Sequence, residues 1–205
     1  MSKRKIIISL FDYTGNWSKP YKENGFEVVQ VDIQHGIDIL TWDYTFIPSD
    51  SVLGVLASCP CTDFAVSGAR WFKQKDLDGR TFQSVKLVSK TKEIIDYFKP
   101  EFWVIENPVS RIHKLNTWMG SPVFIFHPYE FSGYGFENDR YTKKTCLWGV
   151  FNVPIKKPLP PLDFSRIHCP KYSNGKNIPW GSIECKNYRS VTPLGFSYAF
   201  YESNH

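Results

Sequence analysis

Residues 51–64 have the sequence SVLGVLASCPCTDF, in which an apolar run leads directly into two cysteines and an acid. The run has the length and composition of a strand that is buried on both faces of a sheet. A second apolar run, FWVI at residues 102–105, leads in the same way into Glu106 and Asn107. Two predicted buried strands therefore end in chemically reactive side chains, which indicates a sheet with a site along one edge.

The rest of the chain alternates short apolar runs with loops or a helix. Apolar residues recur at three- and seven-residue steps between Thr81 and Phe98, which predicts a helix that ends before Pro100. Strands are predicted at residues 5–10, 27–32, 51–58, 102–105, 123–126 and 145–149, and another short element is expected to begin at residues 38–40. This alternation predicts an α/β fold with a mostly parallel, twisted sheet and flanking helices.

The polar residues with chemical potential all follow predicted strands. The segment Thr14–Ser18 follows the first strand, Asp32 ends the second, and Pro60 and Cys61 follow the third. Ligands of open α/β sheets bind beyond the carboxyl ends of the strands. We therefore expect these residues to share one site.

A thiol and a carboxyl at neighbouring strand ends can attack a pyrimidine ring. Cys61 would add to carbon 6, and Glu106 would interact with ring nitrogen 3. Together these steps make carbon 5 nucleophilic enough to accept a methyl group. The alternatives are inert packing for the cysteine and an ion pair for the carboxylate. The Pro-Cys and Glu-Asn contexts together favour catalysis. Asn107 is expected to brace the loop that holds Cys61, and Cys59 is expected to be structural.

The first predicted strand is followed by a turn that contains Gly15, and Asp32 lies at the end of the next strand. An acid at that position can bind the two hydroxyls of a cofactor ribose, as in dinucleotide-binding folds. The fingerprint GxGxxG is absent, which argues against NAD or FAD. An ordinary strand-to-helix turn is the alternative for the Gly15 segment.

Length, net charge and composition limit the classes of protein to which the chain can belong. With 205 residues the chain is long enough for one domain with a full core. Its net charge of +5 suits a polyanionic partner, and its 17% of aromatic residues can form core or stack on bases. The sequence has no secretory signal and no apolar run of membrane-spanning length. These features predict a cytoplasmic protein with reduced thiols.

Zinc binding is an alternative role for the cysteines. The potential ligands are Cys59, Cys61, Cys146, His168, Cys169 and Cys185. Their spacing contains no CxxC pair and no HxxxH, and both are typical of structural zinc sites. The sequence therefore disfavours zinc.

Residues 152–189 interrupt the α/β pattern of residues 1–151 with a stretch rich in Pro, Lys, Asn and Ser. We predict a short, irregular, basic insertion there, which either follows a phosphate backbone or is a solvated loop. Its cations are Lys156, Lys157, Arg166, Lys171 and Lys176. Residues 190–205 are predicted to form a terminal helix that returns to the core, with Thr192 as its N-cap and Pro193 in the first helical position.

Two of these motifs resemble those of DNA (cytosine-5) methyltransferases. CPCTDFAVSG at residues 59–68 resembles motif IV of that family, in which Cys61 takes the position of the nucleophile. Residues 106–108 (Glu-Asn-Pro) resemble the Glu-Asn-Val of motif VI. The Gln and Ser that the family carries in motif IV are replaced by Thr62 and Ala65.

The resemblance also implies a pocket for S-adenosylmethionine. FDYTGNWSKPY at residues 11–21 resembles motif I with its run of glycines reduced to one, and Asp32 and Asp38 resemble the acids of motifs II and III. RSVTPLGFSYAF at residues 189–200 resembles motif X, the helix that closes the pocket. The implied cofactor-binding residues are Phe11, Thr14, Gly15, Asn16, Trp17, Asp32, Ile33, Asp38, Pro60, Ser190 and Thr192.

RYTKKTCLWG at residues 140–149 resembles motif VIII, where basic residues at the start of a strand hold the target base and phosphate. Arg140, Lys143 and Lys144 are the candidates, and Arg140 and Lys144 join Cys61 and the Glu-Asn pair in the catalytic set that we predict. Members of the family usually carry a sizeable recognition region after motif VIII. Only the short 152–189 segment stands there, as in small phage-type stand-alone methyltransferases.

The resemblance implies a Rossmann-like methyltransferase fold and methyl transfer from S-adenosylmethionine to carbon 5 of cytosine in DNA through a covalent Cys61 adduct. The target base would be flipped out of the duplex. The expected partner is DNA, duplex or single-stranded, bound with low specificity, with room for an accessory recognition partner and no membrane. Alternatives are modification of free cytosine nucleotides and a non-catalytic nucleic-acid-binding relative. The expected location is a bacterial cytoplasm or a phage-infected host cell.

Overall fold

The computed structural model describes residues 5–162, 172–179 and 181–205. One six-stranded sheet organises the chain, with strand order β2-β1-β3-β4-β6-β5. The strands are β1 (Ile6–Leu10), β2 (Glu27–Val31), β3 (Val52–Ala57), β4 (Phe102–Pro108), β5 (Phe124–Phe126) and β6 (Thr145–Val150). All six strands that the sequence predicts are present, whereas residues 38–40 form a turn rather than a further element.

The central strands are parallel and their carboxyl ends coincide. β2, β1, β3 and β4 pair in parallel, and β6 runs antiparallel between β4 and β5. In this register Leu10 of β1 is opposite both Val31 of β2 and Ala57 of β3. Ala57 is in turn opposite Ile105 of β4. The structure therefore confirms an α/β fold with a mostly parallel sheet.

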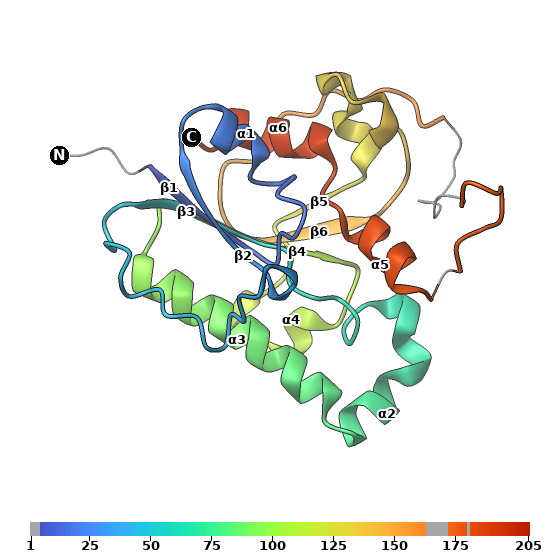
Figure 1. Ribbon diagram of the computed structural model, residues 1–205, viewed down its shortest axis with the longest axis horizontal. Coiled ribbons are helices and arrows are strands. Elements are labelled where there is room, and N and C mark those ends of the chain that lie inside the picture. The colour runs from blue at the N-terminus through green and yellow to red at the C-terminus, as the bar shows by residue number, and fades with distance from the viewer. Residues whose placement is uncertain (1–4, 163–171, 180) are drawn as a thin grey trace.

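Helices cover both faces of the sheet (Figure 1). They are α1 (Lys19–Glu23), α2 (Phe72–Leu77), α3 (Arg80–Phe98), α4 (Ile112–Leu115), α5 (Ile183–Ser190) and α6 (Leu194–Ser203). Successive strand residues point to opposite faces, so Ile8 of β1 packs in one core cluster with Val88 of α3. Ile7 packs in the other cluster, with Phe196 and Phe200 of α6. Three layers result, with α3 on one side and α1 and α6 on the other.

The C-terminal part differs from the sequence-based expectation in two places. Residues 183–190 form α5 inside the segment expected to be irregular, and the Ser182 hydroxyl caps this helix by accepting from the amide of Cys185. The terminal helix begins at Leu194 with Pro193 as its N-cap residue, so Thr192 does not cap it. The polar composition around residue 183 hides α5, because its helical pattern is only two turns long.

In the described ranges no helix is both long and apolar enough to cross a membrane. Nor do three or more His, Cys, Asp or Glu side chains gather there in a way that could hold a metal ion. His168, Cys169, Arg166 and Lys171 lie outside the described residues.

The thiols only partly match the prediction that all are reduced. Cys59, Cys61 and Cys146 are free. Cys185 is disulfide-bonded, so the prediction is wrong at that position.

Gly54, in the middle of β3, allows the Phe102 ring of β4 to lie against the strand. A Cβ atom at Gly54 would fall 2.0 Å from the ring. We expect Gly54→Ala to lower the free energy of unfolding by about 1–3 kcal/mol, the usual cost of overpacking a core. Chemical denaturation measures this, with Gly181→Ala as the control because a Cβ there meets nothing within 4 Å. Equal stabilities for the two variants would contradict the packing described.

Candidate active site

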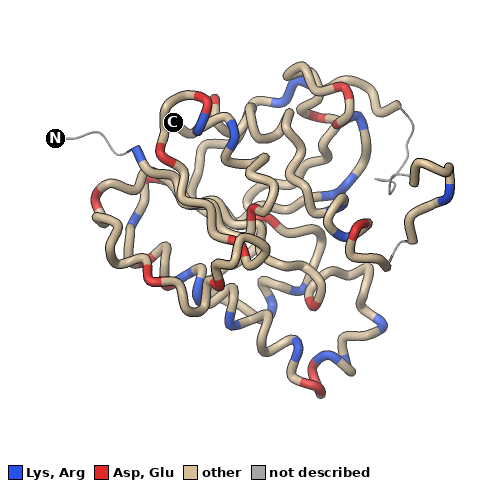
Figure 2. Tube along the Cα trace, viewed as in Figure 1, with Lys and Arg blue, Asp and Glu red and all other residues tan. Residues whose placement is uncertain are grey.

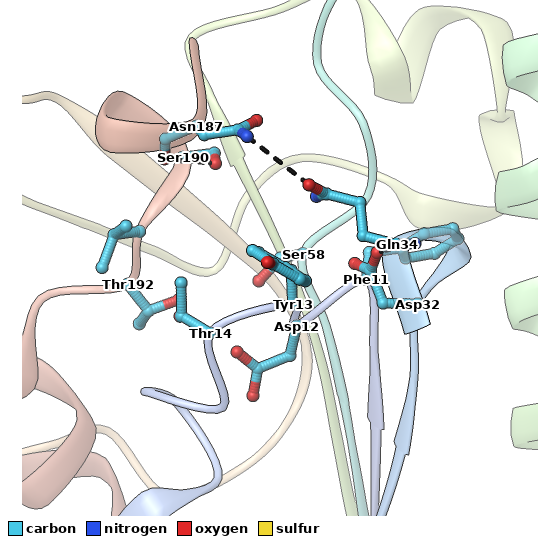
Figure 3. Close-up of a pocket in the computed structure, with 11 residues that line it drawn as sticks. Phe11, Asp12, Tyr13, Thr14, Asp32, Gln34, Ser58, Asn187, Ser190 and Thr192 are labelled. Carbon is cyan, nitrogen blue, oxygen red and sulfur yellow. Dashed lines mark hydrogen bonds between the residues drawn. The ribbon is translucent and has the colours of Figure 1, made fainter. Parts of the chain in front are cut away.

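A pocket opens beyond the carboxyl ends of β1, β2 and β3 (Figure 3). Its walls are formed by Phe11, Asp12, Tyr13, Thr14, Asp32, Gln34, Ser58, Asn187, Ser190, Val191 and Thr192. Five of the predicted cofactor-binding residues are among them: Phe11, Thr14, Asp32, Ser190 and Thr192. The parallel strand ends and the segment after α5 thus meet where the sequence places a cofactor.

The loop after β1 is held in an unusual backbone conformation. Phe11 has a φ of 58°, in the left-handed region that non-glycine residues rarely adopt, and Gly15 has a φ of 68°. The buried carboxylate of Asp12 stabilises this loop by accepting from the hydroxyls of Ser9 at 2.8 Å and Ser18 at 3.0 Å. Sequence reasoning missed Asp12, although an acid between two serines at a strand end is a readable signal.

Two side chains give the pocket a polar lining that suits a ligand with hydroxyl groups. Asp32 is only 7% exposed, and its Oδ1 accepts from the amide of Gln34 at 2.8 Å. The hydroxyl of Ser58 is buried without a hydrogen-bond partner among the described residues. Because buried polar atoms are nearly always satisfied, the Ser58 hydroxyl indicates that a polar group of a ligand belongs there.

The helix α5 and the linker after it form the opposite wall. The amide of Asn187 donates to Gln34 Oε1 at 3.4 Å across the pocket (Figure 3). The amide of Asn16 donates to the carbonyl of Thr192 at 3.3 Å, so the loop after β1 also touches this linker. Ser58, Gln34 and Asn187 were not predicted, because nothing in their local sequence marks them and only the fold brings them together.

Several predicted cofactor residues lie elsewhere. The structure buries Trp17 completely and packs it against Phe196 and Phe200 of α6. Asp38 accepts from the amide of Leu40 in a turn. The remaining residues of the predicted set that do not line the pocket are Gly15, Asn16, Ile33 and Pro60.

A thiol, a carboxyl and two cations form a second cluster beside the pocket. Lys143 Nζ is 4.0 Å from Glu106 Oε1. Burial raises the pKa of Glu106, and the charge of Lys143 partly offsets this. Burial also raises the pKa of the Cys61 thiol, as does the charge of Glu106, whereas the charges of Lys143 and Arg189 lower it. Lys143 and Glu106 therefore form an ion pair, and the charges of Lys143, Glu106 and Arg189 all act on the Cys61 thiol.

The strand β4 extends further than predicted and carries part of this cluster. Glu106 and Asn107 lie within β4, paired with Leu147 and Cys146 of β6, rather than beyond the end of the strand. The buried amide of Asn107 donates to the carbonyl of Cys59 at 2.8 Å. This bond ties β4 to the loop that leads to Cys61.

The basic residues before β6 are not equivalent. Lys143 approaches Glu106, whereas Lys144 is exposed. Arg140 donates from Nε to the carbonyl of Pro160 at 2.7 Å and pairs with Glu137 at 2.9 Å. The structure therefore brings Lys143, rather than the predicted Arg140 and Lys144, to the carboxyl group.

Two cations that sequence reasoning missed hold the backbone directly after Cys61. Lys75 of α2 donates to the carbonyl of Thr62 and pairs with Asp63 at 3.1 Å, and both side chains are buried. Arg111 donates from two of its nitrogens to the carbonyl of Asp63 at 3.2 Å. A buried lysine needs such partners, and its place here fixes the loop after Cys61.

The cluster contains a possible proton donor, the carboxyl of Glu106, and a possible nucleophile, the thiol of Cys61. A carboxyl with a raised pKa keeps its proton to higher pH than an ordinary carboxyl does, and its protonated form can donate a hydrogen bond. A thiol beside it is reactive once it loses its proton, because the thiolate is the nucleophile. Lys143 and Arg189 are the cations placed to stabilise that thiolate.

These opposing charges predict the pH dependence of Cys61 alkylation. Glu106→Gln removes a charge that raises the pKa of Cys61, so half-maximal alkylation by iodoacetamide should move to lower pH. Lys143→Gln removes a charge that lowers this pKa, so the same profile should move to higher pH. Peptide mass spectrometry reads the label at each pH. Buried Cys59, with its pKa raised to about 12, is the internal reference. If both variants shifted the alkylation profile in the same direction, the opposite effects described for Glu106 and Lys143 on the Cys61 thiol would be contradicted.

Comparisons with known proteins bear on the family and the fold. No protein-family model matches the chain. A Frog virus 3 (isolate Goorha) protein named "Probable DNA (cytosine-5)-methyltransferase" is 26% identical over 155 residues, covering 69% of this chain and 69% of that protein.

A crystal structure described as that of a candidate DNA modification methyltransferase encoded within a prophage (E. coli) matches with a TM-score of 0.50 and 14% identity. The match covers 82% of this chain, which spans only 57% of that solved chain. The resemblance to DNA (cytosine-5) methyltransferases that motifs IV and VI predict is thus confirmed by a sequence relative and by a shared fold.

Proposed function

We propose that this chain transfers a methyl group from S-adenosylmethionine to carbon 5 of cytosine in DNA. The observation that carries the proposal is the cluster of Cys61, Glu106 and Lys143, which adjoins a pocket with an unsatisfied hydroxyl at Ser58. The name of the Frog virus 3 relative supports the same reaction. The catalytic core is proposed to span residues 1–151 together with the terminal helix region 190–205.

The residues of the cluster would prepare the cytosine ring for attack at carbon 5. The Cys61 thiolate forms a bond to carbon 6, and the electron pair of the carbon 5–carbon 6 double bond shifts into the ring. Glu106, in its neutral form, holds a proton at ring nitrogen 3 and stabilises that pair. Carbon 5 is then nucleophilic. Carbon 5 would accept the methyl group that the bound cofactor supplies, and the cofactor would leave as the neutral thioether. Loss of the carbon 5 proton to a base and release of the Cys61 sulfur would then restore the double bond.

The pocket residues would hold the cofactor, which supplies an electrophilic methyl group when bound. Asp32 is placed to accept from the hydroxyls of a ribose. Ser58 offers its unpartnered hydroxyl, and Thr14, Ser190 and Thr192 add further polar groups along the wall. Because Ser58 comes three positions before Cys61, the pocket and the nucleophile lie at the same strand end.

α5 contributes residues both to the cofactor pocket and to the cluster around Cys61. Asn187 and Ser190 line the pocket, whereas Arg189 acts on the Cys61 thiol. The segment 152–189 was predicted to be a separate insertion, and we propose that its last helix belongs to the active site. A shorter recognition segment remains, which is consistent with low sequence specificity and with the alternative of a free cytosine nucleotide as substrate.

Cys61→Ala should abolish methyl transfer, because no other side chain in the cluster can form the bond to carbon 6. It should also abolish covalent trapping on DNA that contains 5-fluorocytosine, while S-adenosylmethionine affinity stays nearly unchanged. Cys59→Ala is the matched control and should have only a small effect on methyl transfer and on covalent trapping. Methyl transfer is measured by mass spectrometry of nucleosides after incubation with labelled cofactor. Normal turnover by Cys61→Ala would falsify the proposed mechanism, and label on dCMP or dCTP alone would favour the nucleotide alternative.

Asp32→Ala should weaken S-adenosylmethionine binding by about 1.5–3 kcal/mol, the range for hydrogen bonds to charged groups. Asp32 also caps the short helix η1 (Ile33–His35) through its contact with the Gln34 amide. Asp32→Asn keeps an acceptor for that contact and removes only the charge, so it separates binding from folding. Titration calorimetry measures both variants. An unchanged dissociation constant in two folded variants would place the cofactor elsewhere.

A further inference from the structure

We propose that residues 157–162, with the sequence KPLPPL, form a docking site for a protein module that binds polyproline II helices in a groove of aromatic side chains. We call these residues the proline segment. They follow β6 along the chain and form neither a helix nor a strand. The inference goes beyond the proposed methyl transfer and does not depend on it, because the proline segment lines no part of the cofactor pocket.

The sequence of the proline segment restricts its backbone to an extended helix. A proline ring fixes φ at about −65°, and the residue before a proline is pushed towards the β or polyproline II region. Pro158, Pro160 and Pro161 are restricted by their own rings, and Lys157 and Leu159 each precede a proline. Nearly the whole segment is therefore biased towards the polyproline II conformation before any tertiary contact forms.

Hydrogen bonds to the rest of the protein recur along the proline segment every three residues. The carbonyl of Lys157 accepts a hydrogen bond at 2.8 Å and that of Pro160 accepts one at 2.7 Å. The amide of Leu159 donates at 3.2 Å and that of Leu162 at 3.1 Å. A polyproline II helix has three residues per turn, so backbone groups three residues apart face the same way. The spacing of the bonds therefore matches that helix. Their partners are Gly133, Arg140 and Tyr129.

Contacts with the short helix η4 (Pro128–Tyr134) hold the proline segment in place before any partner binds. Two of the hydrogen bonds described above join the segment to this element. Directly before the segment, the hydroxyl of Tyr134 donates to the carbonyl of Ile155 at 3.0 Å. In Figure 1 the segment belongs to the orange coil that runs past η4, while Figure 2 shows the charged positions along the same trace. A preformed helix loses little conformational entropy when it binds, which favours affinity.

Apolar side chains of the proline segment remain exposed although its backbone is fixed. Pro158 and Pro160 are exposed, and Leu162 is 68% exposed. Ile155, two positions before the segment, is 69% exposed. A rigid spacer between β6 and α5 would need the same backbone, but it would not need large apolar side chains in solvent. Proline and leucine side chains on a preformed polyproline II helix are the groups that the aromatic grooves of SH3 and WW domains bind.

The charges beside the proline segment do not favour a polyanion as its partner. Lys156 pairs with Glu130 at 2.8 Å. Lys157 Nζ lies 3.6 Å from Glu202 Oε2 and 3.8 Å from the centre of the Tyr134 ring. Both ammonium groups would have to give up a partner before they could bind a phosphate. The exposed prolines and leucine, rather than these cations, are therefore the groups available for recognition.

The test measures binding of the full-length protein to a panel of recombinant SH3 and WW domains by fluorescence titration. Saturable binding to a domain of this panel is expected. Pro158→Ala with Pro161→Ala should weaken that binding roughly 10- to 200-fold, since each change removes two apolar ring carbons from the contact. Leu162→Ala should weaken it by up to roughly 50-fold for the same reason. Because Leu162 is exposed, this second variant keeps the fold intact.

Pro48→Ala is the matched control, because Pro48 is an exposed proline outside the proline segment, and its affinity should equal that of the wild type. Circular dichroism and thermal unfolding report that each variant is folded. The proposal is overturned if no domain of the panel binds the wild type, or if the folded segment variants bind as the wild type does. Equal losses in Pro48→Ala and in the segment variants would also overturn it. A wild-type dimer that the double variant dissolves would instead place a second copy of this chain on the segment, and would reject the proposal.

Discussion

The parallel hydrogen-bonding of β2, β1, β3 and β4 is the constraint on which the rest of the site depends. Because the four strands run the same way in matched register, their carboxyl ends lie at one edge of the sheet. Loops that are far apart in sequence therefore meet there, with Phe11, Asp32 and Ser58 around one pocket and Cys61 immediately beyond it. A slip in the register of β3 would move the Ser58–Cys61 loop relative to both neighbours.

Burial gives the residues at this edge their chemical character. Glu106 has a raised pKa because it is removed from water, and Cys61 has a raised pKa for the same reason. Lys143 is close enough to moderate both. Burial therefore works against the charged forms of both groups, and the charge of Lys143 works in the opposite direction.

Single elements of this short chain contribute to more than one part of the proposed site. α5 contributes Asn187 and Ser190 to the pocket wall and Arg189 to the environment of the thiol. Lys75 pairs with Asp63 and Arg111 stacks over the Phe72 ring, and both also donate to the carbonyls after Cys61.

The sequence by itself determined the six strands, the long helix α3, the α/β class and the places where reactive residues follow strands. These features are local, because apolar periodicity and composition can be recognised within a short window of consecutive residues. Only the tertiary structure decided which side chains share the site. Trp17 lies in the core rather than at the pocket, Lys143 rather than Lys144 approaches Glu106, and α5 closes the pocket. Such outcomes depend on side-chain direction and on contacts between distant segments, which no pattern of neighbouring residues records.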